Sequence, residues 1–380
     1  MALSIPACLN PSRAEFATIF QQLAMREHAR RALAQGADPA SIAPLTSSGN
    51  TPDDRFAMSV GTSRAHMKNN RYGDIVAYDS TRITLPDPYY VNASLIREPE
   101  VGFDSNLVPR RFWIAAQGPI ESTIPSFLSL LLDPPASLSH PDPKLARVKL
   151  IVQLTPLVEQ HREKCAPYFP SDHPGEEWLW SSEDRQDGGT AGVWVRFEGR
   201  DETNKIEGER KSWLRVGKDG DETGRRVLHV EYLGWRDHGV PASPSHLLSF
   251  IQRMNQLNAK LSSESTTTEP STDPAPILLH CSAGVGRTGT YLAISSLLPL
   301  LDHLESTPSS PVPPRDVVDR IQETNPTSYP FEQTIQGAVD HVGLTVDGIR
   351  DQRTTMVQTK EQLAFVYEAL RVAWTERSTT

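Results

Sequence analysis

Cysteine is scarce in this sequence, and long apolar runs are missing from it. The 380 residues include only Cys8, Cys165 and Cys281, too few cysteines for a disulfide framework or a four-cysteine zinc site. No apolar run reaches the roughly 18 residues that a transmembrane helix needs. The start of the chain, MALSIPACLN, lacks the basic segment and long apolar stretch of a secretory signal. We therefore expect a cytoplasmic protein without a membrane span, with access to the nucleus left open.

Positive charge is in deficit as well. The chain has 38 Lys and Arg against 47 Asp and Glu, which gives a net charge of −9 at pH 7. Domains that bind nucleic acids usually carry an excess of basic residues, so this balance argues against such a partner. An acidic protein can still contain a locally basic pocket for a negatively charged substrate.

Low-complexity segments suggest how the chain is organised. Residues 11–34 have the apolar spacing of an amphipathic helix, which we expect to pack on the domain or, alternatively, to lie on a membrane surface. Residues 36–54 are rich in Gly, Pro, Ser, Thr and Asp and predict a linker. We therefore expect a helix and linker over 1–54 and one domain over 55–375. Pro/Ser-rich insertions are predicted within this domain at 133–146, 262–276 and 305–314.

Strand and helix patterns are interspersed between these segments. Apolar or alternating runs predict strands, and apolar residues at helical spacing predict helices. The expected strands are 148–154, 193–197, 227–232 and 276–279, and the expected helices are 247–257, 287–303 and 358–372. This mixture predicts a single α/β or α+β domain.

A glycine-rich loop joins one expected strand to a helix, and it contains Cys281 and Arg287. A cysteine followed six positions later by an arginine can enclose a phosphate group in one loop. The backbone N–H groups between them, together with the helix N-terminus, would attract an anion and favour the thiolate form of Cys281. The guanidinium of Arg287 can bind two phosphate oxygens. The backbone groups of this expected phosphate site belong to Ser282, Ala283, Gly284, Val285 and Gly286.

Two other interpretations compete for this loop. Gly284, Gly286 and Gly289 fit the G-x-G-x-x-G pattern of dinucleotide-binding loops. That pattern also requires an acidic residue after a second strand, about 20 residues further on. Here Asp302 is followed by a Pro/Ser-rich segment instead of a strand. The other interpretation is a buried structural cysteine beside a surface arginine.

The ten residues His280–Gly289, HCSAGVGRTG, resemble the signature of the protein tyrosine phosphatases. The resemblance implies a highly twisted mixed β-sheet flanked by helices, and the Tyr-specific, non-receptor (intracellular) branch. It implies hydrolysis of phosphotyrosine in proteins through a cysteinyl-phosphate, without a metal ion or an organic cofactor. Cys281 would be the nucleophile and Arg287 the phosphate-binding residue. The Thr288 hydroxyl would stabilise the departing thiolate, with His280 in a supporting position.

A second block, Trp235–Pro241, resembles the mobile acid loop of the same family. The resemblance makes Asp237 the general acid for the tyrosine leaving group and later the base for water. Arg236 stands where the family usually has proline, which fixes φ and stiffens the loop. This departure puts in doubt how the loop closes and how fast.

A third block, 68–75, resembles the loop that recognises phosphotyrosine. Tyr72 would stack on the substrate ring and make the pocket deep, which excludes phosphoserine and phosphothreonine. Asp74 would hydrogen-bond the substrate backbone. The structural alternative for Tyr72 is an ordinary core aromatic residue.

Two further blocks resemble supporting loops of the family. In 157–168, Glu159 would orient Arg287 through a salt bridge and Lys164 would meet Asp237 when the acid loop closes. In 353–363, Gln358 would position the hydrolytic water with help from Gln362.

Alternatives to a Tyr-specific enzyme remain at this stage. Arg236 leaves open a catalytically weak protein that only binds phosphotyrosine. A dual-specificity phosphatase is the enzymatic alternative, against which the Tyr72 block argues. The expected partners are phosphotyrosine-containing proteins, with further contacts possible through the N-terminal segment or the insertions.

Overall fold

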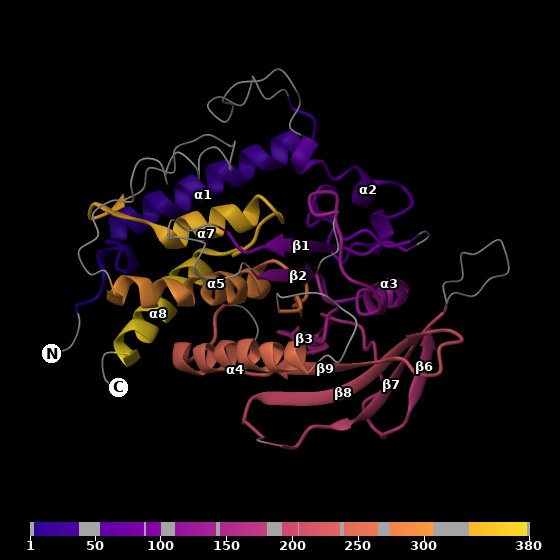
Figure 1. Ribbon diagram of the computed structural model, residues 1–380. Helices are drawn as coiled ribbons and strands as arrows, with labels where there is room; N and C mark the ends of the chain where they lie inside the picture. The colour runs from indigo at the N-terminus through magenta and orange to yellow at the C-terminus, as the bar shows by residue number, and fades with distance from the viewer. Residues whose placement is uncertain are drawn as a thin grey trace.

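The computed structural model of this chain describes ten segments, which Figure 1 shows as coloured ribbon. They are residues 4–37, 54–86, 89–99, 111–141, 145–180, 192–203, 205–235, 239–264, 274–306 and 334–377.

The centre of the molecule is an eight-stranded sheet with the strand order β1-β2-β10-β3-β9-β8-β7-β6. Its strands are β1 (Ala93–Arg97), β2 (Phe112–Ala116), β3 (Leu150–Gln153), β6 (Glu177–Trp180), β7 (Val193–Arg200), β8 (Glu209–Lys218), β9 (Arg225–Tyr232) and β10 (Ile277–His280). The pairs β2–β10, β10–β3 and β3–β9 are parallel, and the outer pairs are antiparallel. The expected mixed, twisted sheet is therefore confirmed (Figure 1).

Helices flank this sheet and cover its parallel centre (Figure 1). The α-helices are α1 (Arg13–Ala34), α2 (Ser59–Thr62), α3 (Ile124–Ser129), α4 (Pro244–Ser263), α5 (Gly286–Ser306), α7 (His341–Arg350) and α8 (Lys360–Arg377). Short 3-10 helices are η1 (Ala7–Leu9), η3 (Asp54–Phe56), η4 (Met67–Asn69) and η5 (Glu121–Thr123). Two-stranded hairpins are formed by β4 (Val158–Glu159) with β5 (Arg162–Glu163), and by β11 (Thr334–Ile335) with β12 (Ala338–Val339).

Side chains alternate between two cores because successive residues of a strand point to opposite faces. In β10, Ile277 and Leu279 join a core with α1, α4, α5, α7 and α8, whereas Leu278 joins a core with α3. The centre of the sheet is therefore buried on both faces. It gives the loop that follows β10 a fixed starting point.

The helix predicted over 11–34 is confirmed as α1, and it packs on the domain as expected. Ser12 and Glu15 form a reciprocal capping box that fixes its first turn. Ile19 and Leu23 are buried in the larger core, and α1 lies along α7 (Figure 1). The boundary between the two predicted parts at residue 54 falls beside residues 38–53, which lie outside the described residues.

The other expected elements are found with their ends moved by a few residues. The four predicted strands are β3, β7, β9 and β10, and the three predicted helices are α4, α5 and α8. The sequence did not predict β8 or α7. Many outward positions of β8 are charged, and α7 begins in a stretch that no motif explained, so neither gave a strong periodic signal.

The predicted insertions are described only in part. In 133–146, Pro135 and Ser137 are buried, and the carbonyl oxygen of Ala136 accepts from the Thr84 N–H at 2.9 Å. The described part of this segment therefore combines the buried residues Pro135 and Ser137 with the exposed Leu138. Most of 262–276 and of 305–314 lies outside the described residues. Among the helices that the structure describes, none is long and apolar enough to span a bilayer.

Candidate active site

Cys281 lies directly after β10, in the loop that leads into α5. Because β10 sits between two parallel neighbours, this loop emerges at the carboxyl end of the sheet, where α/β proteins commonly bind ligands. The predicted strand, loop and helix are all present in the expected order.

The backbone of this loop turns at Gly284. Its φ is +73°, and a Cβ atom there would lie 2.1 Å from the Ala116 carbonyl oxygen, so only glycine fits. The turn brings the Gly284 N–H to 3.2 Å from Cys281 Sγ, to which it donates a hydrogen bond. A donor aimed at the sulfur stabilises negative charge on it.

The carbonyl oxygens of the loop are bound from outside. Arg353 donates from Nε to the Gly284 oxygen at 2.9 Å and from Nη2 to the Ala283 oxygen at 3.2 Å. The Gly118 N–H donates to the Ser282 oxygen at 2.9 Å. In a trans peptide the N–H points away from the C=O, so these contacts turn the loop N–H groups toward its concave side. Contacts from outside the loop therefore fix the orientation of its peptide groups.

Sequence analysis did not include Arg353 among the functional residues, although its side chain is fully buried beneath the loop. Burial lowers the pKa of Arg353 to about 10, so the guanidinium stays charged at neutral pH. The 353–363 block resembles the family's loop through its glutamines, and no local pattern in it points from Arg353 to the loop at 281–287.

Arg287 and Glu159 meet as predicted. Arg287 Nη1 lies 2.7 Å from Glu159 Oε1 and also donates to the Leu154 carbonyl oxygen at 3.2 Å. The side chains are 12 % and 7 % exposed, so the pair is shielded from solvent and fixes the direction of the guanidinium. Lys164 is half-buried on the segment after β5. Its predicted partner Asp237, with Arg236 and His238, lies outside the described residues.

Tyr72 reaches the rim of the phosphate loop. Its hydroxyl lies 2.9 Å from Ser282 Oγ, and the ring is half-buried against the larger core. Asp74 is exposed nearby in sequence, and Arg71 fixes the segment by donating from Nη2 to the Pro119 carbonyl oxygen. The structure thus places the Tyr72 hydroxyl beside Ser282.

The two predicted glutamines lie over the start of α5. A Cβ atom at Gly286 would be 2.9 Å from Gln362 Nε2 and 3.4 Å from Gln358 Oε1. Gln362 is buried and accepts from the Gln358 N–H at 2.9 Å, whereas Gln358 is exposed. The Thr288 hydroxyl is buried and has no hydrogen-bond partner within the described part of the chain. It is therefore available to a group in the loop.

His280 begins a series of uncharged, hydrogen-bonded side chains that leads away from Cys281. Its Nδ1 lies 3.2 Å from the Cys281 carbonyl oxygen and its Nε2 lies 3.1 Å from the Tyr168 hydroxyl. Gln153 Oε1 then contacts both the Tyr168 hydroxyl at 3.2 Å and His229 Nε2 at 3.1 Å. Burial lowers the pKa of His280 to about 4 and holds the pKa of His229 well below its usual range.

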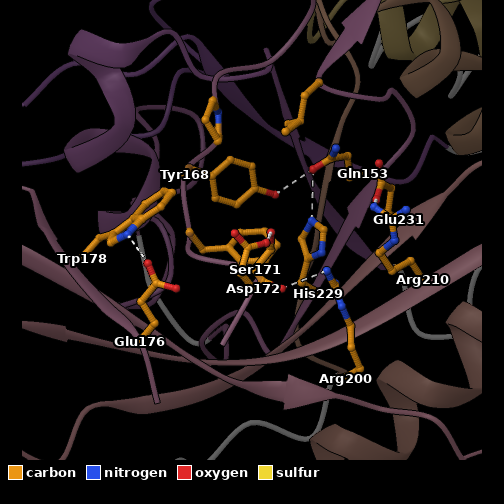
Figure 2. Close-up of a pocket in the computed structure, with 13 residues that line it drawn as sticks. Gln153, Tyr168, Ser171, Asp172, Glu176, Trp178, Arg200, Arg210, His229 and Glu231 are labelled. Atoms are coloured by element: carbon orange, nitrogen blue, oxygen red, sulfur yellow. Dashed lines mark hydrogen bonds and ion pairs between the residues drawn. The ribbon is translucent and has the colours of Figure 1, made fainter. Parts of the chain in front are cut away.

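The series of hydrogen bonds from His280 to His229 ends at a cavity of about 150 Å³ (Figure 2). Figure 2 shows Tyr168, Gln153 and His229 joined by hydrogen bonds on one side of it, with Arg200 and Arg210 nearby. None of the residues that line this cavity belongs to the phosphate loop. The cavity is therefore separate from Cys281 Sγ, and the hydrogen bonds that lead from it reach only the Cys281 carbonyl oxygen.

Among the described residues, no group of three or more His, Cys, Asp or Glu side chains is arranged to hold a metal ion. The other two cysteines, Cys8 and Cys165, are buried. Burial raises the pKa of the Cys8 thiol to about 11 and raises that of Cys165 further, so both thiols stay protonated.

Comparison with known proteins gives a consistent match. A model of the protein-tyrosine phosphatase family matches residues 66–336. Human receptor-type tyrosine-protein phosphatase C is 29% identical over 322 residues, which cover 83% of this chain and 19% of that protein. Tyrosine-protein phosphatase 69D of Drosophila melanogaster is 28% identical, covering 79% of this chain and 16% of its own length. Tyrosine-protein phosphatase Lar-like of Caenorhabditis elegans is 29% identical, covering 85% of this chain and 11% of that protein. The chain thus spans less than a fifth of the length of these relatives.

Proposed function

Because this chain belongs to the protein-tyrosine phosphatase family, we propose that it hydrolyses phosphotyrosine in proteins through a cysteinyl-phosphate intermediate. One observation carries the proposal: the Gly284 N–H is aimed at Cys281 Sγ in a loop whose carbonyl oxygens are bound from outside. Such a loop presents a nucleophile and a set of N–H donors to the same anion.

In the first step, the phosphate dianion binds the loop N–H groups and Arg287. Cys281 attacks phosphorus as a thiolate, an S–P bond forms, and the bond from phosphorus to the tyrosine oxygen breaks. Asp237 gives its proton to the departing oxygen, so that neutral tyrosine leaves. Glu159 supports this step because it fixes the direction of Arg287 at 2.7 Å.

In the second step, water attacks phosphorus and the S–P bond breaks. Asp237, now ionised, takes a proton from the water, and inorganic phosphate and the Cys281 thiolate are formed. Gln358, supported by Gln362, would orient the water. The Thr288 hydroxyl, which has no partner among the described residues, would donate to the departing sulfur.

Selectivity for phosphotyrosine is assigned to the Tyr72 block. The Tyr72 ring beside Ser282 gives the pocket depth, which a phosphoserine or phosphothreonine side chain is too short to span. Asp74 is exposed and free to meet a substrate backbone. A dual-specificity enzyme would hydrolyse phosphothreonine peptides at a comparable rate.

Membership of the non-receptor, intracellular branch and a cytoplasmic location are part of this proposal. They rest on the sequence motifs and on the scarcity of cysteine. The comparisons do not support them, since one of the relatives above is named as receptor-type. The proposed partners are phosphotyrosine-containing proteins, with additional contacts through the N-terminal segment or the insertions.

The test is steady-state hydrolysis of a phosphotyrosine peptide without added metal. Cys281→Ser should abolish turnover, and Asp237→Ala should lower kcat by about 10²- to 10⁴-fold. A phosphothreonine peptide serves as the selectivity control. If the wild-type chain binds the phosphotyrosine peptide without hydrolysing it, the function is that of a binding module, and Arg236→Pro becomes the variant that should restore turnover.

A further inference from the structure

The loop between α7 and α8 contains backbone strain. Thr355 has a φ of 61° and Val357 has a φ of 54°. β-branched residues avoid this left-handed region, which costs about 1–2 kcal/mol per residue. Such conformations persist only where the surrounding structure holds them. The strained segment lies directly between Arg353, which binds the phosphate loop, and Gln358.

Helix α1 supplies the contacts that hold the first strained residue. Glu27 Oε1 accepts from Thr354 Oγ1 at 2.7 Å and from the Thr355 N–H at 2.9 Å. Arg31 donates from Nη2 to Thr355 Oγ1 at 2.9 Å. Glu27 is 7% exposed, so the hydrogen bonds that its carboxylate accepts are shielded from competing water.

A buried ionic cluster fixes α1 itself against α7. Arg30 binds Asp347 and Asp351, each at 2.5 Å, and Arg26 binds Asp347 at 2.6 Å. These guanidinium groups lower the pKa of Asp347 well below its usual range, so Asp347 is ionised at neutral pH. Glu27, which lies between the two arginines in sequence, therefore has a fixed position.

Val357, the second strained residue, is held by Arg350, which also contacts α1. Arg350 donates to the carbonyl oxygens of Met356 and Val357, each at 2.8 Å, and to that of Leu23 in α1 at 3.0 Å. Both α1 and the strained loop lie outside residues 66–336, which match the family model. The conformation of the residues just before Gln358 thus depends on a helix that precedes the matched region.

We propose that Glu27 of α1 is a positioning residue for the hydrolysis of the cysteinyl-phosphate. Its carboxylate holds the Thr354 side chain and the strained backbone of Thr355, and this segment sets where Gln358 stands over the start of α5. The inference rests on the proposed function, in which Gln358 orients the water of the second step. Glu27 does not touch the substrate and acts only through the loop.

The two kinetic constants separate this role from a general structural one. The value of kcat/KM reports the steps up to the release of tyrosine, whereas kcat also includes hydrolysis of the intermediate. A residue that positions only Gln358 should therefore change kcat and leave kcat/KM alone. A residue needed for the phosphate loop or for folding should lower both.

The experiment compares Glu27→Ala with wild type in the full chain, using a phosphotyrosine peptide in rapid-mixing and steady-state assays. Loss of the three hydrogen bonds that Glu27 accepts from Thr354 and Thr355 displaces the loop, so we expect kcat to fall at least about tenfold. We expect kcat/KM to stay within about twofold, with a burst of released tyrosine near one per enzyme and a larger trapped phospho-Cys281 fraction. Glu27→Gln keeps an acceptor oxygen and should recover most of kcat.

Glu15→Ala is the matched control, because Glu15 lies on the same helix but contacts Ser12 and the Gln336 N–H instead of the strained loop. It should leave both constants unchanged. If Glu27→Ala does not fold, Arg31→Gln decides, since Arg31 is 40% exposed and its loss should lower kcat alone by a smaller factor. Equal losses in kcat and kcat/KM, or an unchanged kcat, would overturn the inference. A wild-type chain without turnover would instead overturn the proposed function.

Discussion

Two sets of buried polar side chains lie around the loop at 281–287, and they differ in charge; each set contacts the loop through one member, Arg353 or His280. The charged group comprises Arg353 together with the α1–α7 cluster around Glu27, Arg30 and Asp347. The neutral chain runs from His280 through Tyr168 and Gln153 to His229. The charged group lies among helices, whereas the neutral chain crosses neighbouring strands of the sheet.

The difference follows from which partners each environment supplies. Facing helices bring opposite charges within 2.5 Å, so ionised side chains can be buried there. In the sheet, burial without a carboxylate partner lowers the pKa of His280 to about 4 and keeps the ring uncharged. Positive charge near Cys281 therefore comes from the guanidinium of Arg353, and not from the neighbouring His280.

Among the substitutions that test this difference, we expect the largest effect at Arg353. In Arg353→Met the side chain keeps most of its length and apolar bulk, but the Ala283 and Gly284 carbonyl oxygens lose their donors. Each unsatisfied buried carbonyl costs about 1–3 kcal/mol, so we expect a loss of about 2–5 kcal/mol in the free energy of unfolding. Urea unfolding measures this loss, and kcat/KM for a phosphotyrosine peptide should fall by at least about 10²-fold because the loop N–H groups are no longer fixed.

Arg353→Lys is the control for charge. It keeps the positive charge but cannot donate to both carbonyl oxygens with one planar fork. We expect its stability and its kcat/KM to lie between those of the Arg353→Met variant and those of wild type. A lysine variant as active as wild type would show that charge, and not the two hydrogen bonds, supports the loop.

The neutral chain makes a prediction about pH. In the unfolded chain a histidine has a pKa near about 6.5, so below that pH the unfolded state takes up protons that folded His280 and His229 do not. Stability from these groups is therefore present above about pH 6.5 and is lost as pH falls toward 4, at about 1.4 kcal/mol per pH unit for each histidine. For His280 the whole loss is about 3 kcal/mol, given its folded pKa of about 4.

Urea unfolding between pH 7 and pH 5 measures this dependence. Since burial holds the pKa of His229 well below its usual range, His229→Gln should make stability less dependent on pH below about pH 6.5. His173 is exposed, so His173→Gln should leave the dependence unchanged. Equal pH profiles for wild type and His229→Gln would mean that His229 is not held neutral in the folded protein.

The smallest effect is expected for Tyr168→Phe. This change removes the hydroxyl that joins His280 to Gln153 but keeps the ring, so about 1 kcal/mol should be lost from the free energy of unfolding. Because the chain is neutral and does not bind phosphate, kcat/KM should change by less than about threefold. A loss as large as that in Arg353→Met would make the two supports equivalent.

The contiguous parts of the site could be predicted from the sequence. The strand, the glycine-rich loop and the helix at 277–306 occur in order along the chain, and the spacing of Cys281 and Arg287 is a local property of one loop. The pairing of Arg287 with Glu159 was expected only through resemblance to a family. The structure places both residues in contact at 2.7 Å.

The supports of the loop could not be predicted in the same way. Arg353 follows the loop by about 70 residues and Glu27 precedes it by more than 250, and neither carries a local pattern that points to the loop. A buried arginine is identified only by what surrounds it.

The sequence by itself determined the chemistry of the loop, because a thiol, an arginine and glycines at fixed spacing can form only a few arrangements around an anion. It also determined the alternation of strands and helices through the period of apolar residues. The tertiary structure decided which side chains hold that loop, which ones stay charged and which stay neutral. These properties depend on burial and on partners brought together from distant parts of the chain, so they exist only after folding.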